Sequence, residues 1–139
     1  MLHKSDYKYF SKARHVAELS DFKQVHVGCV AVYKKNIIGV GYNTNKTHPL
    51  QKKYDKFRFN EEDPILCHKL HAEINCINEI RHMDIPFHKV KLYIYRKCTE
   101  RPFGISRPCA SCMAAIKELG IRNIFYTTDT GYAFEKLVA

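Results

Sequence analysis

The chain is organised around two short stretches, His71-Ala72-Glu73 and Pro108-Cys109-Ala110-Ser111-Cys112. A catalytic zinc ion takes three protein ligands and leaves a fourth position for water, and one imidazole with two thiolates is a recurrent ligand set. Proline directly before the first cysteine is typical of the first turn of a helix, where the partial positive charge of the helix N-terminus favours ionised thiolates. We therefore predict that His71, Cys109 and Cys112 bind zinc.

Glu73 stands two residues after His71, which is too close for both side chains to bind one metal from a helix. Its carboxylate can reach a water molecule at the metal from the side, so we predict that Glu73 is the proton shuttle. A Cys-x-x-Cys pair with a distant histidine is also compatible with a structural zinc site or a redox pair. A structural site is closed by a fourth protein ligand and needs no carboxylate beside the histidine, so the sequence favours a catalytic centre.

His-x-Glu followed by Pro-Cys-x-x-Cys is the signature of zinc-dependent nucleobase deaminases. In these motifs the chain resembles the cytidine and deoxycytidylate deaminase superfamily, and the resemblance covers roughly residues 7–128. Three shorter stretches support it: Val27-Gly28-Cys29-Val30, Gly41-Tyr42-Asn43 and Gly120-Ile121-Arg122.

The resemblance implies hydrolytic deamination of a cytosine ring, in which Glu73 moves a proton from water to ring atom N3 and then helps the amine leave as ammonia. The segment His-Ala-Glu-Ile-Asn-Cys-Ile, residues 71–77, is similar to the deoxycytidylate branch, so a dCMP-like nucleotide is the expected substrate. Two alternatives stay open. One is a deaminase of cytosine or adenine in tRNA or single-stranded DNA, and the other is an inactive zinc-containing module that only binds nucleotide.

Substrate contacts follow partly from the resemblance, because the superfamily position that matches Asn43 contacts the sugar of the substrate. A pocket for a base also needs an aromatic wall, for which Tyr42, Tyr126 and Tyr132 are candidates. Besides Asn43, the predicted substrate-binding residues are Val27, Gly28, Ala72, Ser106, Arg107, Pro108 and Tyr132.

The formal net charge of +9 favours anionic partners, either a nucleotide phosphate or a nucleic-acid backbone. The predicted loop at 97–107 leads directly into the second metal-binding stretch, so its cations lie beside the metal. For a nucleotide phosphate we expect Arg107 and Arg101 first, and then Lys52 and Lys53 from an earlier polar stretch.

The bulk composition is that of a soluble globular protein, with 45% hydrophobic and 27% charged residues in 139 residues. We expect one domain over 1–139, long enough to bury a single core. No apolar run approaches the length that crosses a bilayer, and the first six residues lack the apolar core of a signal peptide. These features predict no membrane partner and a cytoplasmic location, where the six cysteines stay reduced.

Hydrophobic periodicity predicts the helices and strands of an α/β protein. The resemblance implies that they form a three-layer α/β/α cytidine-deaminase-like fold with a mixed sheet. The first two strands form an antiparallel hairpin, and the fourth runs parallel to the third after a right-handed crossover through the cysteine-bearing helix. The predicted helices are 4–19, 67–81 and 109–119, and the predicted strands are 25–33, 37–42, 90–95 and 121–128.

Two segments depart from this regular pattern. The polar stretch 44–66 shows no clear period and is predicted to be a loop that acts as a lid or a phosphate-facing flap. It leads to Cys67 and His68, where a second metal site is conceivable. Superfamily members commonly continue through another helix to a fifth strand, whereas here only one short element at 131–137 follows. The C-terminal part is therefore shortened, the fourth strand is predicted to be an edge, and we expect a homo-oligomer.

Overall fold

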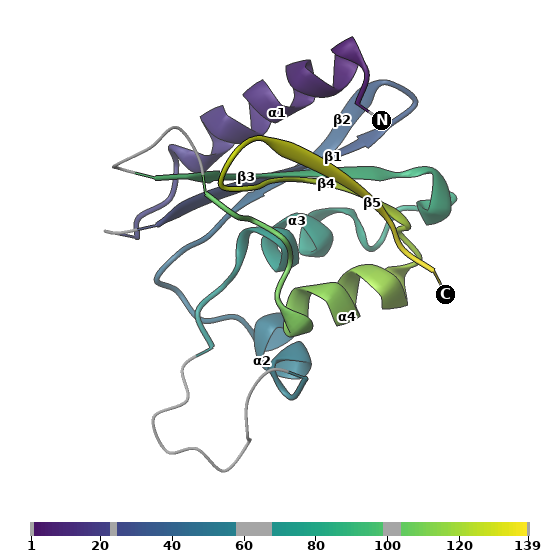
Figure 1. Cartoon of the computed structure of the whole chain (residues 1–139). Helices are drawn as coiled ribbons and strands as arrows, with labels where there is room; N and C mark the ends of the chain where they lie inside the picture. Colours follow the sequence, from purple (N-terminus) through teal and green to yellow (C-terminus); the bar gives the residue numbers. More distant parts are fainter. Residues whose placement is uncertain (1, 23–24, 58–67, 99–103, 139) are drawn as a thin grey trace.

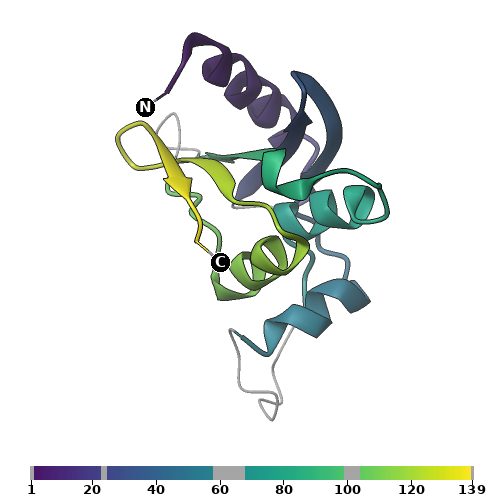
Figure 2. The same ribbon diagram turned by 90° about the vertical axis from the view of Figure 1, so that its right-hand side faces the viewer.

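A mixed five-stranded sheet with the strand order β2-β1-β3-β4-β5 forms the middle layer of the protein. The computed structural model describes residues 2–22, 25–57, 68–98 and 104–138. Helix α1 covers one face of the sheet, and α3 and α4 cover the other, with α2 beyond them (Figures 1 and 2). The predicted three-layer fold is confirmed.

The strands are β1 (His26–Tyr33), β2 (Asn36–Tyr42), β3 (Lys91–Lys97), β4 (Asn123–Thr127) and β5 (Tyr132–Lys136). The helices are α1 (Lys4–Ala17), α2 (Pro49–Asp55), α3 (Ala72–Ile80), the short 3₁₀ helix η1 (Phe87–Lys89) and α4 (Ala110–Leu119).

The central strand β1 pairs antiparallel with both β2 and β3, so that Cys29 lies opposite Gly41 on one side and Ile94 on the other. Helices cover both faces of β1, which explains why its sequence is a continuous apolar run rather than an alternating one. Strand β4 runs parallel to β3. The hairpin and the parallel pair are both as predicted.

The end of the chain differs from the expectation of an exposed fourth strand. After a turn in which Thr128 N–H donates to the carbonyl of Gly131, β5 pairs antiparallel with β4 along its whole length. The short last element is therefore a strand that is reached without another helix. It takes the edge position that we expected for β4.

Helix α2 lies within the stretch that we predicted to be a loop. The His48 side chain accepts a hydrogen bond from Leu50 N–H at 3.0 Å, and Pro49 occupies the first turn, so the N-terminus is well capped. Two of its four buried residues, Gln51 and Asp55, are polar. A seven-residue helix with so few apolar positions leaves no readable period. The rest of the predicted flap, residues 58–67, lies outside the described residues.

Helix α3 begins at Ala72 rather than near residue 67. Leu70 N–H donates to the carbonyl of Lys46, and Leu70 in turn accepts from Thr44 N–H. These bonds hold the segment before the helix in an extended conformation, and His71 becomes the N-cap residue. The predicted metal ligand thus lies at the helix end and not within the helix.

Two glycines allow helices to lie directly on the sheet. A Cβ atom on Gly28 would lie 2.0 Å from the carbonyl oxygen of Ala13 in α1, and one on Gly41 would lie 2.4 Å from Ala72 O and from Cys76 N in α3. Gly41 therefore sets how closely the N-terminal turn of α3 approaches β2. None of the helices in the described ranges is long and apolar enough to span a membrane.

Candidate metal centre

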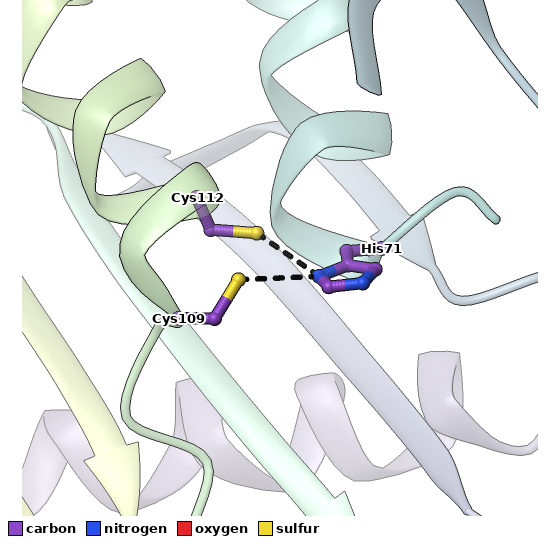
Figure 3. A group of neighbouring side chains, drawn as sticks. All are labelled: His71, Cys109 and Cys112. Atoms are coloured by element: carbon purple, nitrogen blue, oxygen red, sulfur yellow. Dashed lines mark hydrogen bonds between the residues drawn. The ribbon is translucent and has the colours of Figure 1, made fainter. Parts of the chain in front are cut away.

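The three predicted metal ligands converge from the N-terminal ends of two helices (Figure 3). His71 caps α3, Cys109 caps α4, and Cys112 lies in the first turn of α4. His71 Nδ1 lies 3.5 Å from Cys109 Sγ and 3.3 Å from Cys112 Sγ, and the three donor atoms lie within 4.8 Å of one another. One imidazole and two thiol groups at these distances fit a zinc ion with one coordination position left over.

The two cysteines hold their protons very differently. A hydrogen bond with Cys112 lowers the pKa of Cys109 to about 3, helped by a bond with His71 and opposed by burial. Burial raises the pKa of Cys112 well above its usual value, and the neighbouring Cys109 and Glu73 raise it further. Cys112 is therefore the thiol that must lose a proton when a metal cation enters the site.

Glu73 lies in the first turn of α3 and is almost fully buried, with 6% of its surface exposed. Burial raises the pKa of its carboxyl group, while the neighbouring His71 lowers it. A carboxyl group with a raised pKa takes up a proton more readily near neutral pH than an exposed one does. These surroundings suit the predicted role of Glu73 as a proton shuttle.

A buried amide holds the backbone of His71 in place. Gln51 in α2 is fully buried, and its Oε1 accepts a hydrogen bond from His71 N–H at 3.0 Å. Its Nε2 donates to Asp55 Oδ1 at 2.8 Å. Because an N-cap residue has no partner for its own N–H within the helix, Gln51 satisfies a donor that would otherwise be buried without a partner.

Asp55 continues this network on the far side of Gln51. Its Oδ2 lies 2.7 Å from His68 Nδ1. Burial opposes ionisation of Asp55, but the hydrogen bonds with His68 and Gln51 outweigh it and lower the pKa. His68 is thus paired with a buried carboxylate, and Cys67, its proposed partner in a second metal site, lies outside the described residues.

A cavity of about 530 Å³ opens beside the metal ligands. His71, Glu73 and Cys109 are part of its wall. The predicted substrate-binding residues that line it are Val27, Asn43, Ala72, Ser106 and Arg107.

Three predicted substrate-binding residues do not line this cavity. Gly28 follows Val27 on β1, and because successive strand residues face opposite sides, it lies against α1 instead. Pro108 is buried. Tyr132 also packs on the α1 side, where its ring centroid lies 4.5 Å from that of Phe10.

The side-chain polar groups of Asn43 and Ser106 already have protein partners. Asn43 Oδ1 accepts from Val27 N–H and its Nδ2 donates to Val25 O, both at 2.9 Å, which ties the start of β1 to the end of β2. Ser106 Oγ lies 2.9 Å from Ile94 O, to which it donates, and accepts from Thr127 N–H at 2.8 Å. Both residues shape the wall of the cavity.

The sequence did not indicate several other residues of the wall. Phe22 supplies an aromatic ring there, whereas the three tyrosines predicted for that role are not among the lining residues. Phe22 lies in an irregular segment between α1 and β1, where no periodic pattern pointed to it. The lining residues that were not predicted are Phe22, Val25, Lys69, Leu70, Arg96 and Ile105.

The cations around the cavity differ in how far they are already neutralised. Arg107 makes two hydrogen bonds of 2.9 Å with the carboxylate of Glu135, which raise its pKa. Arg96 donates weakly to Ile105 O at 3.4 Å, and its buried Nε has no hydrogen-bond partner among the described residues. A carboxylate therefore already neutralises Arg107, whereas the guanidinium of Arg96 makes only this weak bond to a carbonyl oxygen among the described residues.

The other cations that we expected near a phosphate do not contribute to this wall. Lys52 and Lys53 lie on α2 and do not line the cavity, and Lys53 Nζ lies 3.8 Å from Glu118 Oε1. Arg101 is outside the described residues.

Comparison with known proteins gives a family and a fold. Residues 3–128 match the family model described as the cytidine and deoxycytidylate deaminase zinc-binding region. A search of curated proteins found no match.

Similar solved structures include the dCMP deaminase of cyanophage S-TIM5 in complex with dCMP and dUMP, with 20% identity and a TM-score of 0.64 over 92% of this chain and 84% of that chain. The cytidine deaminase of Burkholderia pseudomallei is 13% identical, with a TM-score of 0.62 over 98% of this chain and 93% of that one. Acinetobacter baumannii RibD is 16% identical, with a TM-score of 0.51 over 90% of this chain and 28% of that one. At these identities the likeness concerns the fold alone.

Proposed function

Because the chain belongs to the family of the cytidine and deoxycytidylate deaminase zinc-binding region, we propose that it hydrolyses a cytosine nucleotide, dCMP or a close analogue, to the uracil nucleotide and ammonia. One observation carries the proposal. The donor atoms of His71, Cys109 and Cys112 lie within 4.8 Å of one another, and His71, Cys109 and Glu73 line one cavity. A binding module that does no chemistry has no need of a buried carboxylate beside its metal ligands.

The chain's own residues account for the proton transfers. His71, Cys109 and Cys112 would hold a zinc ion, which would supply a water molecule whose pKa is brought toward neutrality. Glu73 would accept a proton from that water and return it to ring atom N3 of the cytosine as the water oxygen adds to C4. It would then move the hydroxyl proton at C4 to the amine, which leaves as ammonia and gives the uracil ring. The raised pKa of Glu73 favours this exchange near neutral pH.

A nucleotide with a phosphate group suits the cavity better than an uncharged nucleoside does. Its wall carries three cations, Lys69, Arg96 and Arg107, and Phe22 offers an aromatic face for a base. Lys69 Nζ donates to Asn45 O, and Arg107 is paired with Glu135. The Arg96 guanidinium makes only a weak bond of 3.4 Å to Ile105 O among the described residues, so we assign the phosphate contact first to Arg96.

The test measures ammonia release from cytidine, deoxycytidine, CMP, dCMP, single-stranded DNA and tRNA by the zinc-loaded protein. We expect dCMP or CMP to be the best substrate. Glu73→Gln keeps the size of the side chain and should lower kcat at least about 100-fold, the usual scale for a general acid–base group, with zinc still bound. Ammonia release from none of these substrates, or near-normal turnover by zinc-loaded Glu73→Gln, would contradict the proposal.

A further inference from the structure

A second hollow of about 560 Å³, which we call the lysine hollow, lies at the other end of β1 from the metal cavity. Val27 lines the metal cavity and Val32 lines the lysine hollow, so the two are separated by about 16 Å of strand at about 3.3 Å per residue. Five lysines surround this hollow: Lys8, Lys34, Lys35, Lys89 and Lys91. All five are exposed, and none forms an ion pair with a carboxylate in the described part of the chain.

The β1–β2 turn brings two of these lysines to the hollow at a conformational cost. Lys34 and Lys35 have φ angles of 50° and 68°, in the left-handed region that residues other than glycine and asparagine adopt reluctantly. A two-residue hairpin turn with two positive φ angles favours Asn-Gly. Lysine at both positions is therefore not explained by the turn. Mutual repulsion among the five ammonium groups adds to the cost unless an anion is bound.

Two tyrosines of the hollow already have partners for their hydroxyl groups. Tyr9 donates its hydroxyl hydrogen bond to Lys35 O at 2.8 Å, and Tyr93 donates to the buried carboxylate of Asp6. The Lys34 ammonium lies 5.3 Å from the ring centroid of Tyr33, which holds that side chain near the hollow. The main groups that the hollow offers an anion are the five flexible lysine side chains, and lysines bind phosphate as point charges rather than through a fixed fork.

We propose that the lysine hollow binds the phosphate backbone of a nucleic acid without reading its sequence. Five spread charges exceed what one phosphate group can contact, but successive phosphates of a strand can engage them together. The proposal is independent of the deaminase function, since it rests on a different part of the surface. A chain with Glu73→Gln should bind the same ligand equally well.

The experiment measures binding of a labelled single-stranded DNA 20-mer between 50 and 200 mM salt, with the duplex and a single-stranded RNA as further arms. Each phosphate contact with a single strand contributes about −0.7 to the slope of log K against log salt. Five contacts give a slope of about −3.5, so this fourfold rise in salt should weaken binding about 100-fold.

Substitution of the turn separates binding from folding. Lys34→Asn with Lys35→Gly removes two charges and introduces the preferred turn residues, so it should raise the midpoint of thermal unfolding. With two contacts fewer, the same rise in salt should weaken oligonucleotide binding only about 20-fold. The matched control is Lys52→Gln with Lys53→Gln, an adjacent lysine pair on α2 that lines neither cavity, and it should leave the salt slope unchanged.

Three outcomes would overturn the proposal. One is that the turn variant binds the oligonucleotide as tightly as the wild type. The second is that the α2 control loses as much oligonucleotide affinity as the turn variant does. The third is displacement of the oligonucleotide by dCMP or inorganic phosphate at equal phosphate concentration, which would indicate a small-anion site.

Discussion

Gln51→Met tests how far α2 controls the metal centre. Methionine has a similar volume but can make neither bond of the Gln51 amide, so the His71 N–H and Asp55 Oδ1 lose their 3.0 Å and 2.8 Å partners. A buried donor or acceptor left without a partner costs about 1–3 kcal/mol, so two of them should lower the free energy of unfolding by about 2–6 kcal/mol. Loss of a group that orients a metal ligand typically lowers metal affinity about 10- to 100-fold.

Zinc affinity is measured by competition with a chromogenic chelator, below the unfolding midpoint of each variant, and stability by urea unfolding. Lys52→Met is the control, because Lys52 is the next residue of α2 and is exposed. It should leave zinc affinity unchanged. If folded Gln51→Met holds zinc within twofold of the wild-type affinity, the amide does not position His71, and its bonds serve folding alone.

Two further results are expected. Arg96→Met should raise KM for dCMP by about 10- to 100-fold, since a hydrogen bond to a charged group contributes about 1.5–3 kcal/mol, and should leave KM for deoxycytidine unchanged. Arg107 is already paired with Glu135, so Arg107→Met should raise KM for dCMP less than Arg96→Met does. Steady-state kinetics with dCMP and deoxycytidine would reject the assignment if Arg107→Met gave the larger rise. Because the pKa of Glu73 is raised by burial, the metal-free wild-type protein loses stability as the pH rises through that raised pKa, whereas Glu73→Gln does not. Urea unfolding of the metal-free proteins should therefore show that Glu73→Gln is more stable than the wild type at pH 7. Below about pH 4 the two proteins should be equally stable. Equal stability at pH 7 would rule out a buried charge at Glu73.

The sequence by itself was sufficient to identify the three residues that converge at the candidate metal centre. The zinc-binding pattern consists of one histidine and two cysteines, with a glutamate two residues after the histidine. These motifs are short stretches of sequence, so they can be recognised without knowing how the chain packs. The same holds for the main layers of the fold, because the apolar run of β1 and the apolar patterns of α4 and β4 are properties of each segment. Helix α2 was not predicted, because it is short and half of its buried residues are polar.

Only the tertiary structure decided which side chains face the cavity and which are already engaged. Val27 and Gly28 are neighbours in sequence, but strand alternation sends one to the cavity and the other to α1. The bonds of Arg107 with Glu135 and of Gln51 with His71 join residues 28 and 20 positions apart. Such pairs form only when separate elements pack together, and no periodic pattern in the sequence predicts which polar groups will bond to each other. The candidate metal ligands can therefore be identified from the local sequence. The hydrogen bonds that hold them, and the cations that no carboxylate neutralises, depend on how the helices pack against the sheet.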